Sequence, residues 1–195
     1  MNTTERIVES YFRLCLNCFT YADVKVASGN NRQLDLLATN LREDSQYHVE
    51  TSVTHELSWR AKWSAMQAHF ERKFFGAPMP REGAKTDYTR GRNYFEEIKK
   101  TYRQLGFAPN KVHRIWVTWV IPEDEDYAKL LSRYCRTKRL GKYPIQVLSF
   151  RDTVLPELLT KVRKSNYSDD ALRTLSLLKQ FKSQRRALRG DELDF

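Results

Sequence analysis

The sequence predicts an α/β protein in which helices cover both faces of a mixed central sheet. Three patterns support this class. Residues 30–55 read as two strands joined by a hairpin, and residues 112–121 (VHRIWVTWVI) form a nearly continuous apolar run typical of a buried central strand. Segments with apolar residues at helical spacing lie between and around these strands. With 195 residues, the chain is long enough for one domain with a sizeable core.

The N-terminal part is expected to contain one helix followed by three strands. Thr3 or Thr4 can cap a helix over about residues 5–18, with a glutamate in its first turn. The inward stripe of this helix is expected to consist of Val8, Phe12, Cys15 and Phe19. The three strands are expected over residues 23–26, 34–38 and 47–54.

The remainder is expected to alternate helices and strands. A long helix over about residues 56–74 would place Trp59, Trp63, Met66, Phe70 and Phe74 inward, with Arg60, Lys62, Arg72 and Lys73 on its other side. Residues 75–92 contain glycine and proline and predict a loop. Further helices are expected over 93–105, 122–135 and 155–162, strands over 112–121 and 144–150, and a last helix capped by Ser168. We therefore expect a core domain over 1–150 and, over 151–195, a C-terminal helical extension packed on or beside it.

The charge balance points to a polyanionic partner. Lysine and arginine exceed aspartate and glutamate by 34 to 24, which gives a formal net charge of +10 and a pI of about 9.6. Nucleic acid is the first partner that such a balance suggests, and an anionic membrane surface the second. No apolar run approaches the ~20 residues of a membrane span. The N-terminus also lacks the pattern of a secretion signal, so we expect a cytoplasmic protein.

Two carboxylates are the strongest candidates for a functional site. Asp35 lies in the apolar run LDLLA, and Glu50 lies on the next predicted strand, on the same face as His48. Carboxylates on neighbouring strands of a rigid sheet can hold a hard divalent cation such as Mg²⁺ or Mn²⁺. An unpaired acid is costly to bury, so Asp35 requires a partner: a metal ion, Arg32 or a nearby lysine. His48 could assist catalysis from the same face.

These residues resemble the PD-(D/E)XK nuclease superfamily, the restriction-endonuclease-like proteins that include archaeal Holliday-junction resolvases and Mrr-type enzymes. The resemblance covers roughly residues 5–121. It depends on a first helix with an N-terminal glutamate (Glu9 by its spacing to the helix end, otherwise Glu5), Asp35 in NRQLDLLA, and Glu50 in HVETS followed by a helix. It implies an α-β-β-β-α-β core with a mixed central sheet flanked by helices.

The resemblance implies a metal-dependent DNA endonuclease of repair, resolvase or restriction type. Asp35, Glu50 and the backbone carbonyl of Thr51 would hold Mg²⁺ or Mn²⁺, and the first-helix glutamate would act directly or through water. A metal in such a site lowers the pKa of a bound water and screens charge on the phosphate. Many relatives act as dimers, so the resemblance also allows a homodimer.

The chain departs from the family pattern at one position. The residue two after the glutamate is usually a lysine, and here it is Ser52, which cannot supply a cation. Lys25 on the preceding strand or Lys62 on the following helix could replace it. Without a replacement, the expected function is a nuclease-fold protein that binds nucleic acid or a protein partner without catalysis.

Basic residues in three regions are candidates for contacts with DNA phosphates. One is Arg32, before the second strand. The loop over residues 75–92 could follow a phosphate backbone or could be a simple insertion. The C-terminal segment KQFKSQRRALR could likewise bind phosphates or could be a solvated helix end. The candidates in these two segments are Lys85, Arg90, Arg92, Lys182, Arg185 and Arg186.

Overall fold

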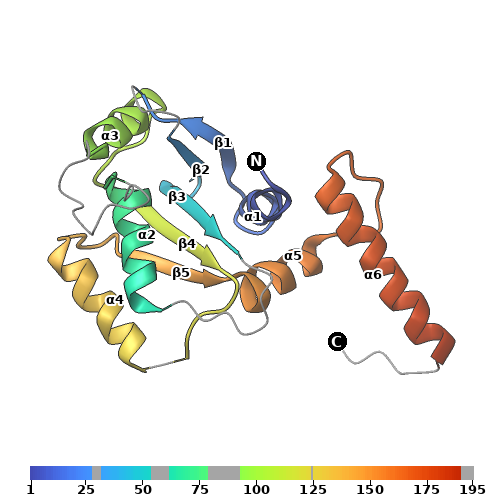
Figure 1. Ribbon diagram of the computed structural model, residues 1–195. Coiled ribbons are helices and arrows are strands. Elements are labelled where there is room, and N and C mark those ends of the chain that lie inside the picture. The colour runs from blue at the N-terminus through green and yellow to red at the C-terminus, as the bar shows by residue number, and fades with distance from the viewer. Residues whose placement is uncertain (28–31, 54–61, 79–92, 124, 190–195) are drawn as a thin grey trace.

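The computed structural model describes residues 1–27, 32–53, 62–78, 93–123 and 125–189. Within these ranges, five strands form one mixed sheet in the order β1-β2-β3-β4-β5 (Figure 1). β1, β2 and β3 are antiparallel neighbours, whereas β3, β4 and β5 run parallel. The strands are β1 (Phe19–Lys25), β2 (Gln33–Asn40), β3 (Ser45–Ser52), β4 (Val112–Thr118) and β5 (Ile145–Ser149). The predicted α/β class with a mixed central sheet is confirmed.

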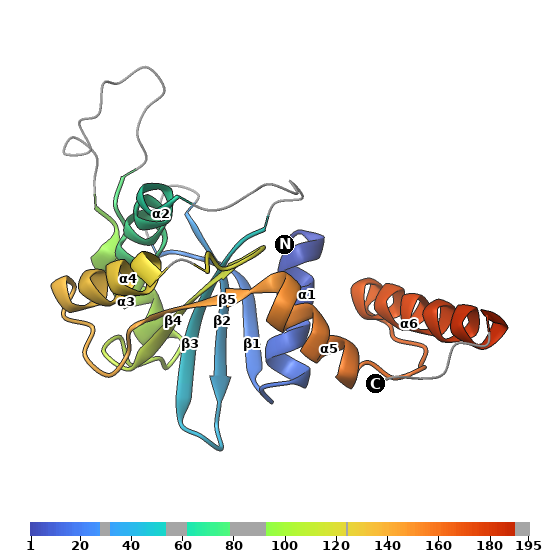
Figure 2. The ribbon, with the colours of Figure 1, turned by 90° about the horizontal axis from the view of Figure 1, so that it is seen from below.

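Six α-helices of the described chain flank this sheet, in the predicted order along the sequence. One side carries α1 (Thr3–Leu14) and α5 (Leu155–Lys161), and the other carries α2 (Trp63–Phe75), α3 (Phe95–Gln104) and α4 (Glu125–Thr137) (Figures 1 and 2). A short π-helical turn over Phe150–Val154 leads into α5, and the C-terminal helix α6 (Asp170–Arg189) extends away from the sheet. No helix of the described ranges is long and apolar enough to cross a membrane.

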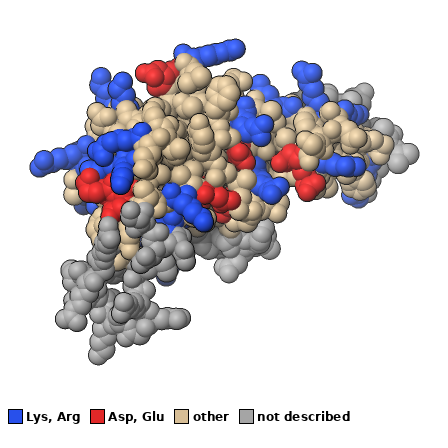
Figure 3. All heavy atoms as spheres, turned by 90° about the horizontal axis from the view of Figure 1, so that it is seen from above, with Lys and Arg blue, Asp and Glu red and all other residues tan. Residues whose placement is uncertain are grey.

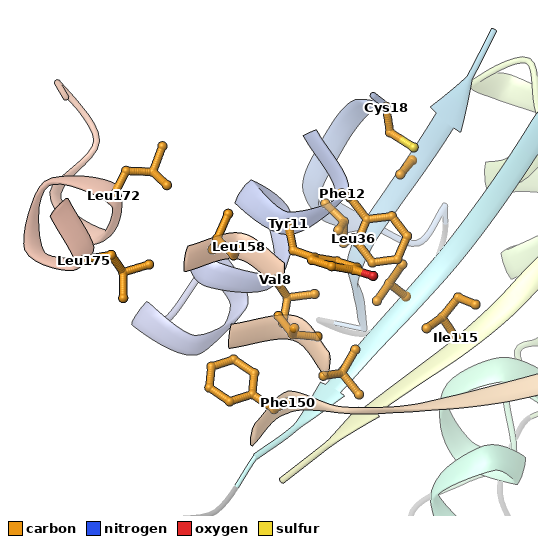
Figure 4. Close-up of a cluster of buried hydrophobic side chains, with 14 of the residues drawn as sticks. Val8, Tyr11, Phe12, Cys18, Leu36, Ile115, Phe150, Leu158, Leu172 and Leu175 are labelled. Carbon is orange, nitrogen blue, oxygen red and sulfur yellow. The ribbon is translucent and has the colours of Figure 1, made fainter. Parts of the chain in front are cut away.

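The face under α1 is closed by a single apolar cluster (Figure 4). Val8 and Phe12 of α1 meet Leu36 of β2 and Ile115 of β4, because alternate strand residues point to this face. Leu158 of α5 belongs to the same cluster, and Leu172 and Leu175 attach α6 to it. The core on this side therefore includes residues from both sides of position 150, and the predicted domain boundary there stays a prediction.

The opposite face is closed by two aromatic-rich clusters. Phe70 and Phe74 of α2 pack with Trp116 of β4 in one of them, as the predicted helical stripe requires. Tyr102 of α3 packs with Leu37 of β2 in the other. Helix α2 therefore lies over the middle of the sheet, which places its side chains above β3.

Several local details differ from the sequence-based expectation. Helix α1 begins after Asn2, whose side chain forms a reciprocal capping box with Glu5, so neither Thr3 nor Thr4 is the cap. The helix ends at Leu14, and Phe19 lies in β1 with 65% of its surface exposed. Asp169, not Ser168, caps α6, because its Oδ1 accepts the Leu172 N–H at 2.8 Å. The predicted helical residues 56–61 lie outside the described ranges.

Candidate acidic site between β2, β3 and α2

The candidate site forms where the regular pairing of the first three strands is interrupted. The β1–β2 register runs through Ala22↔Leu36 and Val24↔Leu34 but omits the intervening pair. The omitted residue of β1, Asp23, has a φ of 52°, a left-handed conformation that L-residues rarely adopt. Pairing between β2 and β3 likewise stops at Leu36↔Val49, although β3 continues to Ser52. On the side that faces β2, the end of β3 is therefore free to contact side chains, while its other side stays paired with β4.

Asp35 is the β2 residue at which pairing with both neighbouring strands is interrupted, and its carboxylate contacts β3 there. Its Oδ2 accepts the backbone N–H of Thr51 at 2.8 Å, in place of a strand–strand hydrogen bond. The N–H and carbonyl of one strand residue point to the same side, so the Thr51 carbonyl also faces β2. The Asp35 side chain is 13% exposed, so the site remains accessible to solvent at this point.

Glu50 brings a second carboxylate to the same place. Its side chain is fully buried and projects from β3 toward the face that α2 covers. One of its oxygens, Oε2, lies 2.6 Å from Nζ of Lys73. The same ammonium lies 3.1 Å from Asp35 Oδ1. The two carboxylates that the sequence singled out therefore converge on one cation.

Lys73 was not among the predicted site residues. The sequence-based interpretation placed it on the outer side of its helix, and this is wrong. Lys73 follows Met66 by seven residues and Phe70 by three, spacings that put all of them on the same side of a helix. The side chain extends from α2 to the carboxylates and remains 28% exposed. The spacing to Met66 and Phe70 was the available signal, and the basic neighbour Arg72 obscured it.

The proximity of the three groups shifts their proton affinities. Burial, and then the neighbouring Glu50 carboxylate, raise the pKa of Asp35 to about 6, although Lys73 and the Thr51 N–H oppose the shift. Burial also raises the pKa of Glu50, against the pull of Lys73. Burial lowers the pKa of Lys73, but the two carboxylates outweigh it, and the net shift is upward. Lys73 is therefore an ammonium that donates hydrogen bonds.

A buried histidine and tyrosine continue the site beneath Glu50. His48 Nε2 lies 2.7 Å from Glu50 Oε1, and His48 Nδ1 lies 2.6 Å from the hydroxyl of Tyr102 on α3. All three side chains are fully buried. Burial, and then the charge of Arg114, lower the pKa of His48 to about 3, so the imidazole is neutral.

The donor set suits a hard divalent cation. Two carboxylates and the Thr51 carbonyl are oxygen ligands, which Mg²⁺ and Mn²⁺ prefer. The ammonium of Lys73 shows that one positive charge is accommodated between the carboxylates. Among the described residues, no group of three or more histidine, cysteine, aspartate or glutamate side chains could hold a metal ion. A metal here would therefore need the backbone carbonyl and water to complete its coordination.

The other predicted catalytic residues are not seen to contact Asp35 or Glu50. Glu9 accepts a hydrogen bond from Thr20 Oγ1 at 2.8 Å, and Glu5 is engaged in the capping box of α1. Both belong to the helix on the opposite face of the sheet. Lys25 and Lys62 are exposed, at the end of β1 and at the N-cap of α2. Ser52 ends β3 opposite Thr118 of β4.

The predicted DNA-binding residues have different environments. The guanidinium of Arg32 donates to the backbone carbonyls of Arg72 and Ala77, the latter at 2.8 Å, and stacks on Tyr94. It therefore binds the C-terminal end of α2, and the lysine alternative for the partner of Asp35 is the one observed. Lys182 and Arg185 are exposed on α6, which also contains Arg186. Lys85, Arg90 and Arg92 lie outside the described ranges.

Comparison with known proteins identifies no relative of this chain. No family model matches the chain, and neither a curated protein nor a solved structure is found to match it. What is established is an α/β protein with a mixed sheet of five described strands, and a cluster of Asp35, Glu50 and Lys73 on the face under α2.

Proposed function

We propose that this protein is a metal-dependent DNA endonuclease of the PD-(D/E)XK type, which hydrolyses phosphodiester bonds. Asp35, Glu50 and the Thr51 carbonyl would hold Mg²⁺ or Mn²⁺. Lys73 would take the role of the lysine that the family pattern places at position 52. The observation that carries the proposal is the meeting of Asp35 Oδ1 and Glu50 Oε2 around one ammonium, at 3.1 and 2.6 Å.

The roles of the side chains follow from their burial and charge. When bound, the metal would lower the pKa of a water molecule and screen the phosphate charge. In the metal-free protein two carboxylates raise the pKa of Lys73, and as an ammonium it would donate a hydrogen bond to an oxygen that becomes more negative during hydrolysis. Asp35 and Lys73 are partly exposed whereas Glu50 is buried, so a phosphate would approach from the side of Asp35 and Lys73.

The charge of the surface is consistent with a nucleic-acid substrate. The chain carries a formal net charge of +10, and lysine and arginine side chains occur at many places on the face shown in Figure 3. Helix α6 presents Lys182 and Arg185 to solvent beyond the part that packs through Leu172 and Leu175. We include Lys182 and Arg185 among the residues that contact DNA phosphates.

Cleavage of DNA tests the proposal. Purified protein would be incubated with supercoiled, linear and branched DNA in Mg²⁺ or Mn²⁺, with a chelator as the blank. We expect cleavage that Asp35→Asn, Glu50→Gln and Lys73→Met each abolish. Glu96→Gln is the matched control, because Glu96 is 74% exposed and pairs only with Lys99 among the contacts described. Absence of cleavage on every substrate, or full activity of Asp35→Asn, would contradict the proposal.

A second candidate function is nucleic-acid binding without catalysis. One observation favours it: Lys73 already neutralises part of the charge of Asp35 and Glu50, so the cluster can exist as a structural ion pair. Calorimetric titration with Mn²⁺ distinguishes the two functions. Metal binding that Glu50→Gln abolishes supports the nuclease, whereas salt-sensitive DNA binding without a metal site supports the binding protein.

A further inference from the structure

The hydrogen-bonded chain from Tyr102 through His48 to Glu50 has no part in the mechanism above. It runs from α3 to β3 entirely inside the protein, with all three side chains at zero exposure. Its two contacts, at 2.6 and 2.7 Å, are short for hydrogen bonds that involve an imidazole nitrogen. A buried chain of this kind requires every donor to have an acceptor, so the direction of each hydrogen bond can be deduced.

The direction follows from the charge at the Glu50 end. Lys73 Nζ lies 2.6 Å from Glu50 Oε2, and a Glu50 side chain that binds a cation is a carboxylate, which only accepts hydrogen bonds. His48 Nε2 must therefore carry the proton and donate to Glu50 Oε1. A neutral imidazole has one N–H, so His48 Nδ1 accepts, and the hydroxyl of Tyr102 donates to it.

Packing prevents the imidazole from turning over. The centroid of the His48 ring lies 5.0 Å from that of Phe74 on α2 and 5.7 Å from that of Tyr102, and both pairs are T-shaped. Reversal of the ring would carry each nitrogen away from its partner and leave two buried polar groups unpaired, which is costly. The rotamer of His48 is therefore fixed by two helices that do not themselves carry the carboxylates.

We propose that Tyr102 and His48 are positioning residues that hold Glu50 Oε1 in place and leave Glu50 Oε2 as the oxygen directed at the bound cation. The inference deepens the proposed function, and it rests on that function for the identity of the cation as Mg²⁺ or Mn²⁺. Partners that orient a metal-binding side chain typically change metal affinity by about 10–100-fold when they are removed. We expect an effect of this size from loss of the His48 donor.

Two substitutions at one position separate the positioning role from a merely structural one. In His48→Gln the amide nitrogen can reach the place of Nε2 and keep the donor to Glu50. In His48→Asn the shorter side chain can only replace Nδ1 and accept from Tyr102. Both variants lose the imidazole ring, and Asn also leaves the larger cavity, so a structural role would lower the Mn²⁺ affinity of each variant only in step with its loss of stability in urea.

The experiment measures Mn²⁺ affinity by calorimetry for wild type, His48→Gln, His48→Asn and Tyr102→Phe, with urea unfolding to verify that each is folded. We expect His48→Asn to bind Mn²⁺ about 10–100-fold more weakly. His48→Gln should stay close to wild type, with Tyr102→Phe between them. Equal affinities of the Asn and Gln variants would overturn the proposal.

Nitrogen-15 NMR of the metal-free wild type tests the hydrogen bonds independently. We expect His48 to be protonated at Nε2 and unprotonated at Nδ1, and a proton at Nδ1 would overturn the proposed direction. This measurement does not depend on the metal. If wild type bound no Mn²⁺, the proposed function would fail, while the NMR result would still decide whether His48 donates to Glu50.

Discussion

Replacement of Lys73 by methionine is the substitution that most directly tests the ion cluster. Methionine has a similar length but no charge, so Asp35 and Glu50 would face each other without a cation. Removing one partner of a buried ion pair usually costs about 3–5 kcal/mol. Because Lys73 is 28% exposed and Asp35 is 13% exposed, water can partly compensate, and we expect about 2–3 kcal/mol at pH 8.

The assay is urea and thermal unfolding of the metal-free protein at several pH values. For a domain of this size, the expected loss lowers Tm by about 5–10 °C. The loss should shrink below pH 6, because Asp35, whose pKa is already about 6 with Lys73 present, then takes up a proton. Saturating Mn²⁺ should restore stability, since it replaces the missing positive charge.

Lys62→Met is the matched control on the same helix. Lys62 is an exposed N-cap residue, so its substitution should change stability by no more than about 0.5 kcal/mol. The reasoning is refuted if Lys73→Met is as stable as Lys62→Met at pH 8. It is also refuted if the stability difference between Lys73→Met and wild type stays the same from pH 5 to pH 8.

Further predictions concern proton linkage, a glycine and a helix cap. In metal-free wild type, folding raises the pKa of Asp35 from 3.8 to about 6, so the folded state binds more protons between these pH values and the free energy of unfolding falls by about 3 kcal/mol as pH rises through them. In Asp35→Asn, urea unfolding should no longer show this fall with pH. A pH profile equal to that of wild type would contradict the pKa shift. Gly76→Ala should destabilise the fold strongly, because Gly76 has a φ of 69° and a Cβ would lie 2.4 Å from the backbone nitrogen of Phe95; thermal unfolding equal to wild type would show that this close approach relaxes freely. Glu5→Ala should cost about 1 kcal/mol by breaking the capping box of α1, and a loss of DNA cleavage without that loss of stability would instead place Glu5 in the catalytic machinery.

The order of the helices and strands was predictable because apolar residues recur at strand or helix spacing within each of them. The expected hairpin agrees with β2 and β3, and the apolar strand expected over 112–121 agrees with β4, which ends at Thr118. Element ends were less predictable. Asn2, Thr3 and Thr4 can all cap a helix, and only the reciprocal contact with Glu5 decides between them. Phe19 extends the helical spacing of Val8 and Phe12, but Asn17 turns into the left-handed region at φ 53° and ends the pattern.

The sequence was enough to single out the two carboxylates of the candidate site, and it was not enough to identify the lysine that contacts them. Asp35 and Glu50 lie on adjacent strands, so pairing alone brings them close together. The identity of the lysine depends on how α2 is rotated over the sheet, which is set by Phe70, Phe74 and Trp116 in the aromatic core. A lysine side chain also extends far from its backbone, so strand or helix position alone does not reveal its partner.

The most direct measurement of the central claim is an anomalous-scattering experiment on crystals soaked in Mn²⁺. The proposed function predicts one strong peak within coordination distance of Asp35 and Glu50, with the Thr51 carbonyl beside it and Lys73 displaced from between the carboxylates. Unchanged contacts of Lys73 with both carboxylates, and no peak between them at saturating Mn²⁺, would contradict it.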